Sequence, residues 1–182
     1  MQHLDHAGPG SCRTGKAREM TALRRKQEAG TLTTEEFREN LERIMERNRR
    51  QPERMNAQLE LELLDCSAEK PYSARYLYRP KELFTNPYGG VHGGVVATLA
   101  DTCSGCMMVA LTMKAVSTTD MSVSFLRELK AEAFDICVEC THAGRKLASA
   151  FVKICDHETG ELCATSLTTF IISEGKMPGL RV

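Results

Sequence analysis

The chain has 182 residues, a length that suits one domain with an appendage. Apolar residues make up 42% of it, and 24 Lys and Arg balance 24 Asp and Glu. Because the formal net charge is zero and no stretch interleaves basic with aromatic residues, the chain lacks a general attraction for polyanions. We therefore expect no nucleic-acid partner.

The first residues contain no apolar stretch of the kind that directs secretion, so we expect a cytoplasmic protein. In that compartment the eight cysteines are interpreted as small buried side chains or as metal ligands. Residues 1–19 show no hydrophobic periodicity and are predicted to be disordered.

Residues 20–54 predict a helical N-terminal extension, with amphipathic helices at 20–29 and 34–50. The second helix begins with a capping box, in which Thr33 accepts from an amide and Glu36 reaches back. Two interpretations stay open for the extension: a solvated helical arm, or a segment for docking or oligomerisation.

After residue 56 the apolar period changes from 3.6 to 2. Leu59, Leu61 and Leu63 alternate with polar residues and predict a half-buried strand. A turn at Lys70-Pro71 leads to a second strand at 72–78. Alternate residues of that strand share one face: Tyr72, Ala74, Tyr76 and Tyr78.

The segment 91–113 is apolar and long enough to span a membrane. It also holds glycines, threonines and a central aspartate, and no basic cluster flanks it. We interpret it as a helix buried inside the protein, and expect no membrane contact.

Four further strands are predicted, and hairpin turns at Gly144 and at 156–160 join the last three. They lie at 118–126, 133–141, 147–155 and 162–172. Two strands, one long helix and four strands predict an α+β fold, with an antiparallel sheet curved around a single central helix. No other element is available to bury that helix, so we expect the sheet alone to wrap it.

Two pairs of cysteines have the spacing of zinc ligands, Cys103 with Cys106 and Cys137 with Cys140. Residues i and i+3 share a face on a helix but point to opposite faces of a strand, so the second pair cannot bind one metal. We expect core packing and no metal site. Cys155 and His157 share a strand face, as a nucleophile and its base would, but no third group is evident in the sequence.

The start of the long helix is a candidate site. Helix N-termini carry free N–H groups and positive dipole charge, and Gly93 and Gly94 allow a ligand to approach the backbone. Such amides stabilise an oxyanion on a thioester carbonyl. Taken alone, the segment is better interpreted as a plain glycine-rich loop that enters a helix.

Asp101 is the single carboxylate of this helix. It lies off the apolar stripe, and a buried unpaired carboxylate is costly, so either its side of the helix faces water or the charge has a function. Eight residues, about 12 Å of helix, separate it from Gly93. One carbonyl therefore meets both groups only if Asp101 comes from a partner chain across a two-fold axis. The small residues around Asp101 suit such close approach: Gly94, Ala97, Thr98, Ser104 and Gly105.

The motif Asn86-x-x-Gly89-x-x-His92-Gly93-Gly94, followed by Thr-Leu-Ala-Asp-Thr at 98–102, resembles the hotdog thioesterases of the phenylacetic-acid-degradation (PaaI) type. The strand 120–127 and the hairpin at 142–145 match as well. The resemblance covers about residues 55–173 and implies a hotdog domain at 55–175 with a short tail at 176–182.

The resemblance implies a dimer, often paired into tetramers, that hydrolyses acyl- or aryl-CoA to the free acid and CoA without a cofactor, CoA being part of the substrate. Asp101 would be the nucleophile or general base. The Gly93 amide would hold the oxyanion, with Gly94 adjacent, while Asn86 and His92 shape the site. Thr118 would position water, with Thr119 as its competitor. Arg145 and Lys146 would meet the CoA phosphates, or form a solvated hairpin tip.

Two other functions are considered. The first is a non-catalytic acyl-CoA binder or sensor that acts through the N-terminal helices, although a pure binder needs no carboxylate beside the carbonyl. The second is a hotdog dehydratase, which would need a histidine–acid arrangement not evident around this helix. Medium-chain, aryl and hydroxylated acyl groups all fit the sequence pattern.

Overall fold

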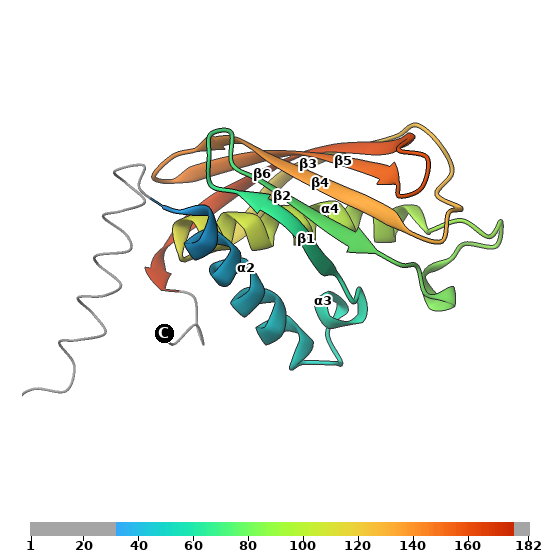
Figure 1. Ribbon diagram of the computed structural model, residues 1–182, viewed down its shortest axis with the longest axis horizontal. Helices are drawn as coiled ribbons and strands as arrows, with labels where there is room; N and C mark the ends of the chain where they lie inside the picture. Colours follow the sequence, from blue (N-terminus) through green and yellow to red (C-terminus); the bar gives the residue numbers. More distant parts are fainter. Residues whose placement is uncertain (1–31, 177–182) are drawn as a thin grey trace, which may run out of the picture.

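The computed structural model describes residues 32–176 (Figure 1). The predicted disordered segment 1–19 and the predicted helix 20–29 lie outside the described residues, as do residues 177–182 of the tail.

Six antiparallel strands form one curved sheet in the order β1-β2-β4-β5-β6-β3. The long helix α4 (Gly93–Thr112) lies along one face of this sheet (Figure 1), so the predicted α+β architecture is confirmed. The strands are β1 (Glu62–Ser67), β2 (Ser73–Tyr78), β3 (Lys114–Phe125), β4 (Phe134–Ala143), β5 (Leu147–Asp156) and β6 (Leu162–Lys176).

Side chains alternate along the central strands as period 2 predicts. In β5, Ala148, Ala150 and Val152 are fully buried, whereas the intervening residues retain exposure. In β4, Cys140 is buried and Cys137 is not, which confirms that these two thiols point to opposite faces. The core therefore lies between the sheet and α4.

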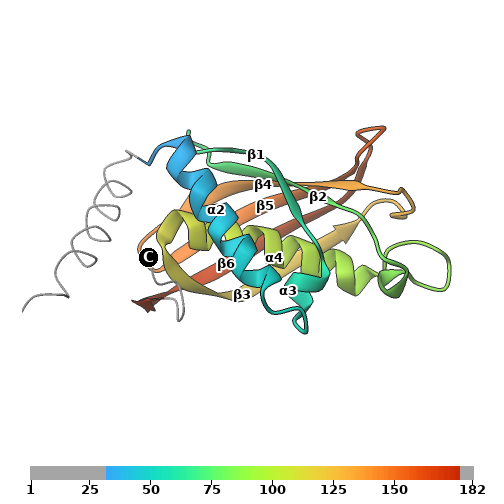
Figure 2. The same ribbon diagram turned by 60° about the horizontal axis from the view of Figure 1, so that its bottom comes forward.

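Helix α2 (Thr34–Arg49) begins with the predicted capping box. Thr33 Oγ1 accepts from the Glu36 N–H at 3.1 Å, and the Thr33 N–H donates to Glu36 Oε2 at 3.0 Å. The helix packs on α4 and β1, crossing α4 on a side that the sheet leaves uncovered (Figure 2). Its buried side chains are Phe37, Asn40, Leu41, Ile44 and Met45.

The packing of α2 corrects two sequence-based expectations. Asn40 Nδ2 donates to the Ala110 carbonyl at 3.3 Å inside the core, so α2 is not a solvated arm. A role of the extension in docking or oligomerisation stays a prediction. The prediction that the sheet alone buries α4 is also wrong, because α2 shares that role. The sequence showed an amphipathic helix but not the surface that would receive it.

The predicted strand around Leu59 is wrong at its start. Residues Met55–Gln58 form the short helix α3, and Glu60 has a φ of 48°, in the left-handed region, so the chain bends before β1 begins at Glu62. Leu59 and Leu61 are nevertheless buried, which explains why they imitate a strand pattern. A 3₁₀ turn, η1 (Glu82–Phe84), follows β2.

Helix α4 has the length and composition of a membrane span, but 72% of its most apolar window is buried inside the protein. The sheet and α2 cover it, as expected of a helix at the centre of a core. Its predicted apolar stripe is buried at Val96, Leu99, Cys103, Cys106, Met107 and Ala110.

Candidate active site

The loop before α4 is organised by Asn86. Its Oδ1 accepts from the Tyr88 N–H at 2.9 Å and from the Gly90 N–H at 3.2 Å. Gly89 has a φ of 83°, a conformation that favours glycine. The His92 N–H then donates to the Phe84 carbonyl at 2.9 Å, which fixes where the helix starts.

His92 is the N-cap of α4, and its Nδ1 accepts from the Gly94 N–H at 3.2 Å. That hydrogen bond requires a lone pair on Nδ1, so the neutral ring carries its proton on Nε2. The Gly93 N–H has no acceptor within residues 32–176. Of the two glycines singled out in the sequence, Gly93 therefore offers a free donor, and the Gly94 amide is occupied.

A cavity of about 180 Å³ opens beside this helix start. A Cβ placed on Gly93 would lie 3.4 Å from Phe125 Cζ, so the edge of that ring lies directly over Gly93. Val91, Val96 and Leu129 add apolar wall. The rest of the lining is polar or charged and includes Asn86, Arg127, Glu128 and Lys130. The cavity thus combines apolar and charged side chains with an unbonded amide. Sequence analysis missed Phe125 and Leu129.

Asp101 and Thr118 are in contact. Thr118 Oγ1 donates to Asp101 Oδ1 at 2.5 Å, which joins the middle of α4 to β3. Thr119 instead donates to the Thr169 carbonyl at 3.2 Å, next to a register shift between Thr118 and Asp120. Of the two competing threonines, Thr118 is the one placed beside the carboxylate.

The side of α4 that carries Asp101 is its least buried side. Gly94 is exposed, and Ala97, Thr98, Asp101 and Gly105 are half-buried. Ser104 departs from the prediction for this group of small residues, because it is fully buried and donates to the Ala100 carbonyl at 2.5 Å. Apart from Ser104, the small residues around Asp101 retain access to solvent or to another chain.

The predicted site residues fall into three groups. Asn86, His92 and Gly93 meet at the start of α4, and Asp101 with Thr118 lies about 12 Å further along that helix. Arg145 and Lys146 lie in the β4–β5 turn. Arg145 shares a cavity with Thr112, about 28 Å of helix from Gly93. One chain therefore does not bring the three groups together.

The paired cysteines of α4 are core residues. Burial raises the pKa of Cys106 to about 12 and that of Cys103 well above its usual value, so both thiols stay protonated at neutral pH. Tyr76 donates its hydroxyl to the Cys103 carbonyl at 3.3 Å. Within residues 32–176, no three His, Cys, Asp or Glu side chains are placed to hold a metal ion.

The Cys155–His157 pair gains a neighbour that the sequence did not reveal. His157 Nδ1 and Asp135 Oδ1 are 2.9 Å apart. In the described part of the chain, however, no hydrogen bond joins Cys155 to His157, and burial, assisted by Asp135, raises the pKa of the Cys155 thiol. The thiol is therefore not activated as a nucleophile.

Residues 88–163 match the sequence model of the Thioesterase superfamily. No match is found among curated proteins compared by sequence. The family match covers the end of the loop before α4, the helix itself and strands β3 to β5. It includes Gly93, Asp101 and Thr118 but begins two residues after Asn86.

Solved structures share the fold. The PaaI protein of the Escherichia coli phenylacetic acid degradation operon is 15% identical, with a TM-score of 0.66 over 79% of this chain and 98% of its own. Zebrafish thioesterase superfamily member 2 is 22% identical, with a TM-score of 0.63 over 73% and 98%. The protein smu.793 of Streptococcus mutans UA159, solved bound to acetyl CoA, is 24% identical, with a TM-score of 0.57 over 64% and 90%. The superfamily match and these structures confirm the resemblance to the hotdog thioesterases.

Proposed function

We propose that this chain, which carries the thioesterase-superfamily fold, hydrolyses an acyl- or aryl-CoA thioester to the free acid and CoA. The observation that carries the proposal is the unbonded Gly93 N–H at the start of α4, beside a cavity that Val91, Val96 and Phe125 line on its apolar part. The superfamily match and a structural neighbour bound to acetyl CoA support this class of substrate.

In the proposed reaction the acyl group occupies the cavity and its carbonyl oxygen accepts from Gly93. The positive end of the α4 dipole stabilises the negative charge that develops on this oxygen. His92 can add a second donor from Nε2. A carbon–oxygen bond forms at the carbonyl carbon, the carbon–sulfur bond breaks, and the CoA sulfur leaves as a thiolate that takes up a proton.

As a base, Asp101 takes a proton from the attacking water, and this proton then passes to the CoA thiolate. As a nucleophile, Asp101 forms a mixed anhydride with the acyl group, which water then hydrolyses to the free acid. The hydroxyl of Thr118 holds Oδ1 at 2.5 Å, which fixes the carboxylate and leaves Oδ2 for the substrate or water. A thioester is reactive enough that these groups suffice, and the proposal includes no metal or cofactor.

The two parts of the site must come from different subunits. Gly93 and Asp101 are about 12 Å apart along one helix, which is too far for one reacting carbonyl. Strand β3 has a neighbour on only one side within the described chain, and Phe125 at its end is 56% exposed. We therefore propose a two-fold dimer in which β3 and the small residues around Asp101 on α4 face the partner. A tetramer, and contacts of Arg145 and Lys146 with CoA phosphates, stay predictions.

Mixed dimers test this arrangement. A subunit carrying Gly93→Pro keeps its carboxylate, and a subunit carrying Asp101→Asn keeps its amide. Each variant alone should be nearly inactive. After random reassociation, half of the dimers contain one intact composite site, so activity should return to about a quarter of the wild-type value. No recovery in verified mixed dimers would overturn the shared site.

Asp101→Asn tests the chemistry itself. Turnover should fall by about 10²–10⁴-fold, the range typical of acid–base groups, with unchanged assembly by light scattering. Release of free thiol from a panel of acyl-CoAs measures it. Asp120→Asn is the matched control, an exposed carboxylate on the same strand as Thr118. If the wild-type chain binds CoA esters but releases no thiol, it is a binder and the hydrolase proposal fails.

A further inference from the structure

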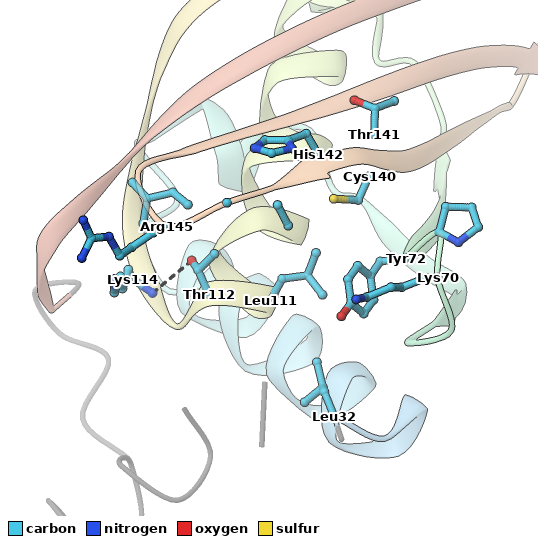
Figure 3. Close-up of a pocket in the computed structure, with 14 residues that line it drawn as sticks. Leu32, Lys70, Tyr72, Leu111, Thr112, Lys114, Cys140, Thr141, His142 and Arg145 are labelled. Atoms are coloured by element: carbon cyan, nitrogen blue, oxygen red, sulfur yellow. Dashed lines mark hydrogen bonds between the residues drawn. The ribbon is translucent and has the colours of Figure 1, made fainter. Parts of the chain in front are cut away.

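A second and larger cavity lies at the other end of α4 (Figure 3). It measures about 830 Å³ and is bounded by the start of α2, the β1–β2 turn, the end of α4 and the β4–β5 hairpin. Sites for small molecules usually measure about 300–1,000 Å³. The cavity is therefore large enough for a ligand of that class.

The wall of this cavity is apolar over one part. Leu32, Leu111 and Ile172 are buried side chains that reach it from α2, α4 and β6. Tyr72 and Ala143 extend the apolar wall. A hydrocarbon chain placed against these side chains would leave water, which favours its binding in proportion to the area covered.

The charged residues around the cavity are all basic. Lys70, Lys114 and Arg145 line it together with His142, and no Asp or Glu does (Figure 3). They come from three separate elements, and none forms an ion pair within residues 32–176. Arg75 and Arg127, by contrast, pair with Asp135 and Glu161. In a chain of zero formal charge, this is a local positive field to which the described residues supply no counterion.

We propose that this cavity binds an anionic amphiphile, with a carboxylate head on the side where Figure 3 shows Lys114 and Arg145 and a linear hydrocarbon tail against Leu32, Leu111 and Ile172. Lys70 lies on the other side of the cavity, beside Tyr72. A neutral lipid would leave Lys114 and Arg145 without a counterion from residues 32–176. A small inorganic anion would leave the apolar wall in water. A free fatty acid satisfies both parts of the cavity. The proposal does not depend on thioester hydrolysis, because Gly93 lies about 28 Å away along α4.

Calorimetric titration of the full chain with dodecanoate, below its micelle concentration, tests the site. Dodecanoate should bind, and acetate and 1-dodecanol should each bind at least about tenfold more weakly, because each lacks one of the two interactions. The double variant Lys114→Gln/Arg145→Gln should weaken dodecanoate binding at least about tenfold. Lys153→Gln, a change at an exposed cation on the outer face of β5, should leave it unchanged.

A second variant keeps the test decisive if the double variant does not fold. Ala143 is exposed at the edge of the cavity, so Ala143→Trp fills cavity space rather than disturbing the core. This variant should lose dodecanoate binding and keep its melting temperature. Unchanged dodecanoate affinity in either folded variant overturns the proposal.

Two further titrations separate this site from the thioester site. Asp101→Asn should lose turnover but bind dodecanoate with wild-type affinity, so either proposal can fail without the other. Coenzyme A alone should not displace dodecanoate. Displacement by coenzyme A would assign Arg145 to the CoA phosphates and would overturn an independent lipid site.

Discussion

Helices α2 and α4 start with similar backbone geometry but differ in whether side chains accept hydrogen bonds from their first amides. Their N-caps, Thr33 and His92, are both extended, with ψ values of 156° and 134°. At α2, Thr33 and Glu36 each accept an amide of the other residue, which closes the helix start. At α4 there is no acidic residue in the first turn, and the Gly93 amide has no acceptor within the described chain.

The difference shows that a helix start serves stability when side chains bind its amides and can serve ligand binding when they do not. Two residue choices decide between these roles. At α2, Thr-x-x-Glu supplies the acceptors. At α4, His-Gly-Gly supplies one acceptor, the His92 ring, and leaves the Gly93 amide open to a ligand. The two sites can therefore be compared by making the same kind of change in each.

Proline at the first helical position should separate the two starts most strongly. Proline removes the N–H but suits this position, and the extended His92 is compatible with a following proline. Gly93→Pro should lower turnover by about 10²–10³-fold, as loss of an oxyanion donor does, with little change in melting temperature. Thr34→Pro, the equivalent change in α2, should leave turnover unchanged. Equal turnover in both variants would contradict the assigned role of the Gly93 amide.

Thr118 should have the next largest effect, because its hydroxyl fixes the carboxylate that, in the proposed dimer, faces the helix start of the partner. Thr118→Val keeps the shape and removes the hydrogen bond, so turnover should fall by about 10–10²-fold, in line with a hydrogen bond to a charged group. Thr118→Ser should restore most of the activity. Thr119→Val, which alters only a bond to the Thr169 carbonyl, serves as the control in steady-state assays.

The smallest effect is expected at the closed helix start. Thr33→Ala should reduce the free energy of unfolding by about 1 kcal/mol, the usual cost of losing an N-cap, and should leave turnover per folded molecule unchanged. His92→Ala should reduce both quantities. Chemical denaturation and thiol-release assays on the same preparations measure this contrast. A turnover loss in Thr33→Ala as large as in His92→Ala would remove the distinction between the two starts.

Local signals in the sequence predicted the elements that depend on neighbouring residues. The capping box of α2, the alternation of the central strands and the start of α4 after His92 follow from residues a few positions apart. The spacing of Gly93 and Asp101 also predicts a site shared between two chains, because the rise of a helix fixes how far apart the two residues lie.

Features that depend on distant segments were not predictable in the same way. A register shift in β3 decides that Thr118, and not Thr119, meets Asp101, and the sequence contains no local sign of it. Phe125 lies over Gly93 although 32 positions separate the two in the sequence. The contact of Asn40 with Ala110 spans 70 positions. Each of these requires knowledge of which surfaces pack together.

The way α2 is held also determines how the protein should respond to a protease. The connection after α2 contains Arg50 and Arg54, both exposed, so trypsin can reach it. Cleavage there would break the peptide bond that links α2 to the rest of the chain. It would leave Phe37, Leu41 and Ile44 buried against α4. The two pieces should therefore travel together on a sizing column and part only in denaturant. Residues 34–49 should behave, in that sense, as part of the same folded body as α4 and the sheet.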